Sequence, residues 1–273
     1  MSDADTSLDQ PADQEETSVT VRMSAVEWQL LSPVLLWLRS LVERTPEVLP
    51  AATGNAFCID ERFADAFAMR LRLFHVLHSP AEAMSKKAFE FAFEFSARAA
   101  GHLATLDPSA TTPEADIMVG GAGFSLKTEA SQGISRTHVV ISKLMESLWT
   151  KHCETIADFL NGIRDHVLPR INHSQRIFVL RAFGRIETDG MIEYELLEVP
   201  RHLLLAIGGV RAADFSPLTG ANGTSAPVVY NGTSAFTLVF DGSDQKITIR
   251  RLLVSQCIVH ARWTIRPPST IRG

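Results

Sequence analysis

Apolar residues recur at helical intervals over most of the first hundred positions of the chain. Leu, Val and Trp follow this spacing between residues 19 and 50, and the same pattern returns at 61–78. A third segment, 79–101, carries the end signals of a helix, with Ser79, Pro80 and Glu82 at its start and Gly101 at its end. These signals outweigh the strand-like alternation of FEFAFEF, so we predict helices in all three segments.

Short extended segments follow a turn-rich loop that ends near residue 115. They cover 116–119, 123–129 and 138–142. Gly120 and Gly121 predict a tight turn between the first two segments. These two segments are therefore expected to pair as neighbouring strands.

The last part of the chain alternates again between helix and strand. A helical pattern occupies 143–168, and we expect Pro169 to end it. Strands at 176–186 and 191–199 then flank ETDG, which is typical of a hairpin. The order α-β-β-β-α-β-β predicts an α/β core with a mixed sheet, and residues 201–273 add further short strands joined by loops.

The composition of the chain is that of a globular protein. At 273 residues and 45% hydrophobic content, the chain can bury a sizeable core. No apolar run approaches the roughly 20 residues that span a bilayer, and the first ten residues do not resemble a signal peptide. We therefore expect a cytoplasmic protein without a membrane partner. The NGT sequences at Asn222 and Asn231 are then expected to form tight turns. The three widely spaced cysteines indicate neither a disulfide framework nor a zinc site.

The charge is distributed unevenly along the chain. The net charge of -5 argues at first against a polyanionic partner, but residues 1–18 hold six acids and no base, and without them the remainder sums to +1. The last 29 residues hold six bases and no acid. This asymmetry predicts a disordered acidic tail and a basic C-terminal surface, and an ordinary solvated face is the alternative.

Residues 116–130, DIMVGGAGFSLKTEA, contain a candidate catalytic group. Side chains alternate faces along a strand, so Ser125, Lys127 and Glu129 share one face. The glycine-rich return brings Asp116 towards Lys127. Carboxylates hold Mg²⁺ while an adjacent ammonium positions water and offsets charge on phosphorus, so the group suits phosphodiester hydrolysis. A surface salt bridge is the alternative.

The order of these elements and motifs resembles the PD-(D/E)xK nuclease superfamily. A helix with a glutamate precedes an aspartate that opens a strand, and FSLKTEA and THVVISKLMES look most like type II restriction endonucleases. The similarity covers roughly residues 80–200 and implies a restriction-endonuclease-like fold. Asp116 would then be the metal-binding aspartate and Lys127 the catalytic lysine. The chain departs from the pattern because Pro113 is not adjacent to Asp116 and Ser125 stands where an acid is expected.

Another carboxylate would have to complete the metal site. Glu129 shares the strand face of Lys127, and in this superfamily a glutamate of the preceding helix often reaches the metal, which makes Glu90 a candidate ahead of Glu94. Glu146 is a further alternative. For each of these residues, an ordinary solvated carboxylate or surface ion pair is the competing interpretation.

DNA contacts are expected from basic residues around the core. Arg136, His138 and Lys143 flank the third strand and are candidates for phosphate contacts, with simple solvent exposure as the alternative. Sequence readout would come from the C-terminal third, where the candidates are Arg250, Arg251, Arg262 and Arg266, with Asn222, Asn231 and Gln256 as neutral readers. Alternation in KITIRRLLV predicts that not all of them face the DNA.

The resemblance implies a Mg²⁺-dependent, sequence-specific double-stranded DNA endonuclease that leaves a 5′-phosphate and a 3′-hydroxyl. A homodimer is expected to match palindromic sites, together with a cognate DNA methyltransferase in the same system. We divide the chain into an acidic tail (1–18), a helical region (19–78), a nuclease core (79–200) and a β-rich recognition region (201–273), with 19–273 as one continuous domain. A repair or junction-resolving nuclease and an inactive DNA-binding protein are the alternatives, the latter because of Ser125.

Overall fold

The computed structural model describes residues 22–42, 48–49, 59–78, 82–107, 115–131, 133–184, 192–219 and 223–265. The expected acidic tail, the ETDG turn, Ser79, Pro80, Asn222 and Arg266 lie outside the described residues. Contacts divide the chain into two units, Met1–Thr45 and Pro46–Gly273. Among the described helices, none is long and apolar enough to cross a membrane.

The first unit contains one described helix, α1 (Ala25–Val42), with Pro33 inside it. This helix confirms the helical spacing seen between residues 19 and 50. Its described apolar side chains, among them Trp28, Leu30 and Leu36, are exposed.

Two packed helices open the second unit, α2 (Glu61–Leu77) and α3 (Lys86–Ala99). Asp60 caps α2, and Ser85 caps α3 by accepting a hydrogen bond from the Ala88 N–H. The start expected at Ser79 was therefore wrong, because Ser85 supplies the cap six residues later. The end was right, since Gly101 has φ +89° and follows the C-cap of α3.

A seven-stranded mixed sheet forms the centre of the second unit. Its order is β1-β11-β7-β6-β4-β3-β2, and every pairing is antiparallel except β4 with β6. The strands are β1 (Val48–Leu49), β2 (Ala104–Leu106), β3 (Ile117–Val119), β4 (Ala122–Glu129), β6 (Arg176–Phe183), β7 (Ile192–Val199) and β11 (Ile258–Ile265). The mixed sheet and its flanking helices agree with the expected α/β class.

Helices α2 and α3 cover one face of this sheet with an aromatic core. Phe67 stacks on Trp263 of β11 with ring centroids 4.7 Å apart, and Phe93 packs against Phe178 of β6. The alternation in FEFAFEF is thereby explained, because Phe89 and Phe93 are buried at helical spacing. Burial of each such ring contributes about 2 kcal/mol of hydrophobic stabilisation, enough to override a local strand preference.

A second, four-stranded sheet has the order β5-β10-β9-β8. Its strands are β5 (His138–Glu146), β8 (Thr224–Tyr230), β9 (Thr233–Asp241) and β10 (Lys246–Leu253). Residues 143–146, expected to begin a helix, instead extend β5 because they pair with β10. The described residues between 201 and 265 are divided between the two sheets: β11 joins the large sheet, and β8, β9 and β10 pair with β5 in the small one.

The helical part of the segment after β5 starts late and runs past its expected end. It comprises a 3₁₀ turn (Leu148–His152), α4 (Ile156–Gly162), a π-helical turn (Ile163–Val167) and α5 (Leu168–His173). Pro169 lies in the first turn of α5 and does not end the segment. The wider π turn directly before it supplies a break in the regular i→i−4 ladder, where a proline is tolerated.

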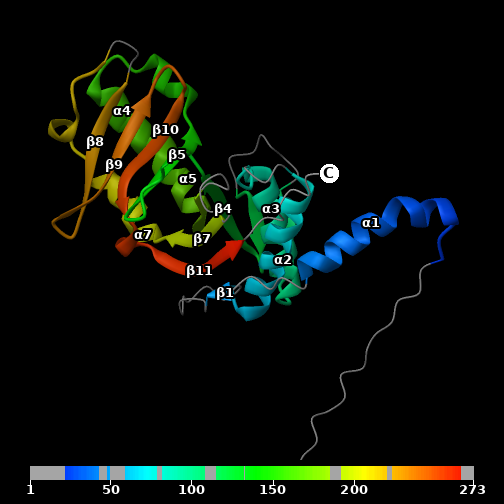
Figure 1. Ribbon diagram of the computed structural model, residues 1–273. Helices are drawn as coiled ribbons and strands as arrows, with labels where there is room; N and C mark the ends of the chain where they lie inside the picture. The colour runs from blue at the N-terminus through cyan, green and yellow to red at the C-terminus, as the bar shows by residue number, and fades with distance from the viewer. Residues whose placement is uncertain are drawn as a thin grey trace, which may run out of the picture. The chain divides into compact units, whose positions relative to one another are not determined.

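These helices and the small sheet cover the other face of the large sheet (Figure 1). Val179 and Leu197 of the large sheet share a core with Phe159 of α4 and Phe236 of β9. The short helix α7 (Arg201–Leu205) adds Leu203 and Leu204 to the same core. The large sheet is therefore packed on both faces, and the β3–β4 hairpin lies near its β2 edge.

Candidate active site

The β3–β4 hairpin brings Asp116 and Lys127 together. Gly120 and Gly121 form its turn with φ values of +58° and +83°, which glycine adopts without strain. The Asp116 N–H donates to the Phe124 carbonyl at 2.9 Å and extends the pairing to the aspartate. Lys127 Nζ consequently lies 3.9 Å from Asp116 Oδ2.

The Asp116 carboxylate is held in a fixed orientation by its neighbours on β4. Its Oδ2 atom accepts hydrogen bonds from the Leu126 N–H at 2.7 Å and from Ser125 Oγ at 3.0 Å. Burial by itself would raise the pKa of Asp116, but the Lys127 charge and the hydrogen bonds from Lys86 and Leu126 hold it below its usual value. The carboxylate is therefore ionised at neutral pH.

Lys127 is largely enclosed, with 13% of its side chain exposed. Burial lowers the pKa of Lys127 to about 8, although the Asp116 carboxylate opposes that change. The positive charges of Lys86 and Arg170 add to the decrease. Lys127 thus carries a proton that it holds much less tightly than an exposed lysine does.

Glu90 joins this group through Lys86. Lys86 lies in the first turn of α3, and its Nζ contacts Glu90 Oε1 at 2.5 Å and Asp116 Oδ1 at 2.7 Å. Lys87 contacts the other Glu90 oxygen at 3.1 Å. The structure therefore gathers two carboxylates and two ammonium groups, Asp116, Glu90, Lys86 and Lys127, which we call the Asp116 cluster.

Glu129 belongs to a different set of contacts. Its Oε2 pairs with Arg181 Nε at 2.7 Å, and its Oε1 accepts the Val140 N–H at 2.9 Å. Arg181 is fully buried and also pairs with Glu195 at 2.8 Å. Burial raises the pKa of Glu129 despite the opposing effect of Arg181. Sharing a strand face with Lys127 has not brought Glu129 into the Asp116 cluster, because the Arg181 guanidinium holds its carboxylate.

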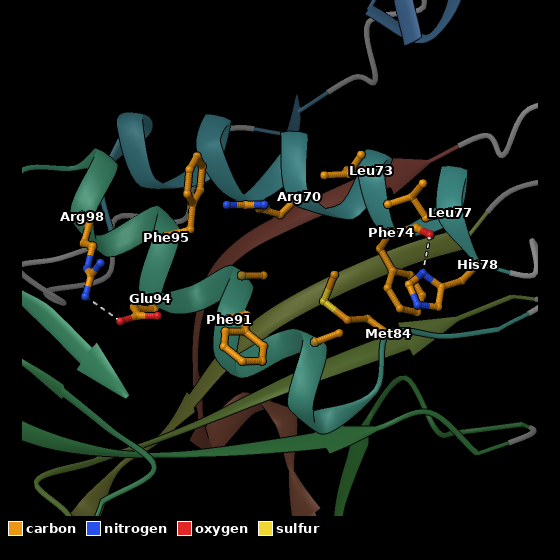
Figure 2. A pocket seen from close by; sticks show the side chains of 12 residues that line it. Arg70, Leu73, Phe74, Leu77, His78, Met84, Phe91, Glu94, Phe95 and Arg98 are labelled. Carbon is orange, nitrogen blue, oxygen red and sulfur yellow. Dashed lines mark hydrogen bonds and ion pairs between the residues drawn. The ribbon is translucent and has the colours of Figure 1, made fainter. Parts of the chain in front are cut away.

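Glu94 faces a pocket of about 470 Å³ between α2 and α3. Figure 2 shows it paired there with Arg98, at 2.7 Å, beside Phe91. Arg70 lies over the Phe95 ring in the same pocket, 3.7 Å from its centroid. The pocket is lined mainly by apolar side chains and contains neither Asp116 nor Lys127, so Glu94 lies apart from the Asp116 cluster.

Around β5, Arg136 and Lys143 are exposed and already paired, and His138 is half-buried. Arg136 pairs with Glu193 at 2.9 Å and lies over the Phe183 ring. Lys143 pairs with Glu146 at 2.5 Å, which places this glutamate in a surface ion pair. The Nδ1 atom of His138 is 3.0 Å from the Thr137 hydroxyl.

The C-terminal arginines occupy two different sheets. Arg250 and Arg251 are both exposed on β10, where Arg251 has φ +60° and the pairing with β5 shifts register between Ile249 and Leu252. This bulge breaks the strict alternation and turns two consecutive side chains outward. Arg262 lies on β11 and pairs with Glu195 at 2.7 Å.

Lys86, a member of the cluster, and Arg170, which lies close to it, were not identified from the sequence. Lys86 stands four positions before Glu90, a spacing that favours an ion pair on a helix, but the wrong helix start obscured its place in the first turn. Arg170 acts electrostatically on Lys127 from α5, more than forty residues further along the chain. No local sequence signal indicates that proximity.

The cluster's donor set fits a hard divalent cation. One ammonium contacts an oxygen of Asp116 and an oxygen of Glu90, so the two carboxylates converge on a single cationic position. Within the described part of the chain, no three His, Cys, Asp or Glu residues come together as a metal site, so an ion bound at this cluster would have two carboxylates as its protein ligands. Mg²⁺ is often bound by one or two carboxylates, with water and substrate phosphate completing its shell.

Comparison with known proteins matched most of this chain. The family model described as SmaI, type II site-specific deoxyribonuclease, matches residues 51–265. The chain is 32% identical over 242 residues to the type II restriction enzyme SmaI of Serratia marcescens, across 86% of this chain and 91% of the relative. No solved structure matches the chain.

Proposed function

This chain belongs to the SmaI family of type II site-specific deoxyribonucleases, and we propose that the Asp116 cluster is its active site. The enzyme class and its DNA substrate follow from the family. The assignment of the site rests on one observation above all, the 3.9 Å approach of Lys127 to a carboxylate that β4 holds in place. The proposed reaction is hydrolysis of a phosphodiester bond that leaves a 5′-phosphate and a 3′-hydroxyl.

Asp116 and Glu90 would hold the divalent ion, which we take to be Mg²⁺. Both side chains present oxygen atoms to the same position, now occupied by the Lys86 ammonium. When bound, the ion would supply Lewis-acid stabilisation of the charge on the phosphate oxygens. Glu90 thereby takes the place of the acid that the motif would have at Ser125.

Lys127 acts on the scissile phosphate and on the attacking water. Its ammonium is nearly enclosed, and in that environment a positive charge stabilises growing negative charge more strongly than it does in bulk water. Ser125 and the Leu126 N–H keep Asp116 oriented while the substrate binds. The hydrogen bond from its hydroxyl makes Ser125 a positioning residue.

Glu129 has a structural role in this proposal. Together, Glu129 and Glu195 neutralise the buried Arg181. Arg181 Nη2 also donates hydrogen bonds to the carbonyls of Ser135 and His138. The guanidinium thereby fastens the loop between β4 and β5 to the large sheet. We no longer assign a metal ligand to this position.

DNA recognition is assigned to exposed basic residues. Arg250 and Arg251 project together from the β10 bulge and are the foremost candidates for base or phosphate contacts. His138 and Lys143 on the neighbouring strand β5 are placed to contribute phosphate contacts. Lys143, Arg136 and Arg262 rank below the two β10 arginines because each is already paired with a glutamate.

The family also suggests how the enzyme is organised in the cell. We propose a homodimer, since two active sites are needed to cut both strands of a palindromic site. We also propose a cytoplasmic enzyme that works beside a DNA methyltransferase of matching specificity. Gel filtration with light scattering tests the dimer directly, and a monomer that stays monomeric on cognate DNA would refute it.

Cleavage of plasmid DNA tests the proposed active site. With Mg²⁺ the wild-type protein should give discrete fragments whose sequenced ends share one short site. D116N and K127M should each lose at least about a hundredfold in rate. E94Q is the matched control, because Glu94 is a carboxylate of the same helix as Glu90 but faces the α2–α3 pocket. Full activity of D116N in a well-folded sample would refute the assignment.

A further inference from the structure

Lys86 occupies the position that the proposed function gives to a divalent ion. Its single ammonium contacts Asp116 Oδ1 at 2.7 Å and Glu90 Oε1 at 2.5 Å. Charge-assisted contacts of this length are strong, and two on one nitrogen leave one proton for solvent. The side chain is also 44% exposed, so it has room to swing outward from its anchor in the first turn of α3.

The two carboxylates need a cation when no metal is bound. Both are mostly shielded, with side-chain exposures of 20% for Asp116 and 10% for Glu90. Like charges converging in such a site repel one another unless a cation lies between them. Lys127 does not bridge the two carboxylates, because its ion pair is with Asp116 and lies on the other oxygen, Oδ2.

From this geometry we infer that Lys86 is a built-in counter-cation, which holds Asp116 and Glu90 together in the metal-free enzyme and leaves when a divalent ion binds. The inference rests on the proposed function of the Asp116 cluster. Lys86 is thus a positioning residue that keeps the site assembled between turnovers. It also competes with the metal, so the metal-free enzyme binds divalent ions less tightly than its two carboxylates would allow.

Lys87 provides a matched control on the next position of the same helix. Of the two carboxylates, its Nζ contacts Glu90 but not Asp116; the Glu90 distance is 3.1 Å, and the side chain is 66% exposed. Removing either lysine deletes one positive charge within hydrogen-bond distance of Glu90. Only Lys86 contacts both carboxylates, so competition for the metal position predicts a much larger effect at Lys86.

Mn²⁺ binding without DNA, followed by the electron paramagnetic resonance signal of the free ion, tests the inference. K86M should bind Mn²⁺ about tenfold more tightly than wild type, since the competing charge-assisted contacts are gone. K87M should stay within about threefold, and K86R, which keeps the charge, should stay close to wild type. Equal changes in K86M and K87M, or weaker binding by K86M, would overturn the inference.

A second measurement uses the wild-type protein and does not depend on the folding of any variant. Lysine acylation read by mass spectrometry should label Lys86 several-fold faster once saturating Ca²⁺ releases its ammonium, while Lys87 changes little. Unchanged or slower labelling of Lys86 would overturn the inference. D116N separates the two proposals: if Mn²⁺ binding survives in D116N, the proposed metal site fails; if binding needs Asp116 but Lys86 labelling does not respond, only the counter-cation role fails.

Discussion

Ser125 Oγ donates a hydrogen bond to Asp116 Oδ2 across the β3–β4 hairpin, at 3.0 Å. The residue that replaces an expected acid therefore contacts the carboxylate that remains. Together with the Leu126 N–H at 2.7 Å, it fixes which Asp116 oxygen is left to face Lys86. In the proposed site, the position where the motif has a metal ligand thus carries a side chain that orients another ligand, Asp116.

S125A should lower the cleavage rate by about fivefold to tenfold. The lost hydrogen bond corresponds to roughly 1 kcal/mol, and the Leu126 N–H still holds Asp116. Single-turnover cleavage on saturating DNA measures this change. A loss as large as that of D116N would show that Ser125 does more than orient Asp116, whereas S125T should retain most of the wild-type rate.

E129Q should impair folding stability much more than metal binding. The change removes the negative charge that faces the buried Arg181 guanidinium, and breaking one partner of a buried pair costs about 3 kcal/mol or more. Urea unfolding should record this loss in the metal-free protein, while Mn²⁺ affinity stays within about threefold of wild type. Loss of Mn²⁺ binding in a folded E129Q sample would restore Glu129 as a metal ligand.

Lys127 should make the stability of the metal-free enzyme depend on alkaline pH. Its pKa is lowered from 10.5 to about 8 by burial, so between these values the unfolded chain binds more protons than the folded one. The cost of burying the charge is fully present below pH 8 and disappears as the pH rises towards 10.5. Stability attributable to Lys127 therefore increases with pH.

Urea unfolding of wild type and K127M measures this dependence. The free energy of unfolding of wild type relative to K127M should rise by roughly 2 kcal/mol between pH 7.5 and pH 10, because each pKa unit corresponds to about 1.4 kcal/mol. Titrations common to both proteins cancel in the difference. A difference that stays constant with pH would mean that Lys127 is solvated and has an ordinary pKa.

R250A and R251A should weaken DNA binding much more than R262A does. Arg250 and Arg251 are exposed on the β10 bulge, whereas the Arg262 guanidinium already binds Glu195 in the protein. Fluorescence anisotropy with Ca²⁺ in place of Mg²⁺ measures affinity without cleavage. Each arginine that contacts phosphate should also reduce the slope of log affinity against log salt by about 1. Equal effects of all three variants would contradict this ranking.

The β3–β4 hairpin was predicted from the sequence more accurately than the helices and the small sheet that surround it. Alternation in β4 and the glycine pair before it are local signals, and they place Asp116 beside Lys127. The assignment of 143–146 to a helix failed because those residues extend β5 only through pairing with β10, about a hundred residues later. Local spacing carries no information about that partner.

The role of Glu129 shows the same limit at the level of one side chain. The strand period correctly placed Glu129 two positions beyond Lys127, but the partner that decides its role, Arg181, lies on a strand 52 residues away. Lys86 was missed for a nearer reason, since the start of α3 was placed at Ser79 rather than after Ser85. Because the helix cap was predicted at the wrong residue, Lys86 was not identified from the sequence as a member of the cluster.

Arg181 also connects the two sheets through its ion pairs and hydrogen bonds. It lies on β6, binds Glu129 at the end of β4, and donates to the carbonyl of His138, the first residue of β5. The sheets cannot slide apart without stripping a buried cation of its partners. A substitution that weakens these contacts should split the single calorimetric melting transition into two, because the large sheet and the small sheet would then unfold separately.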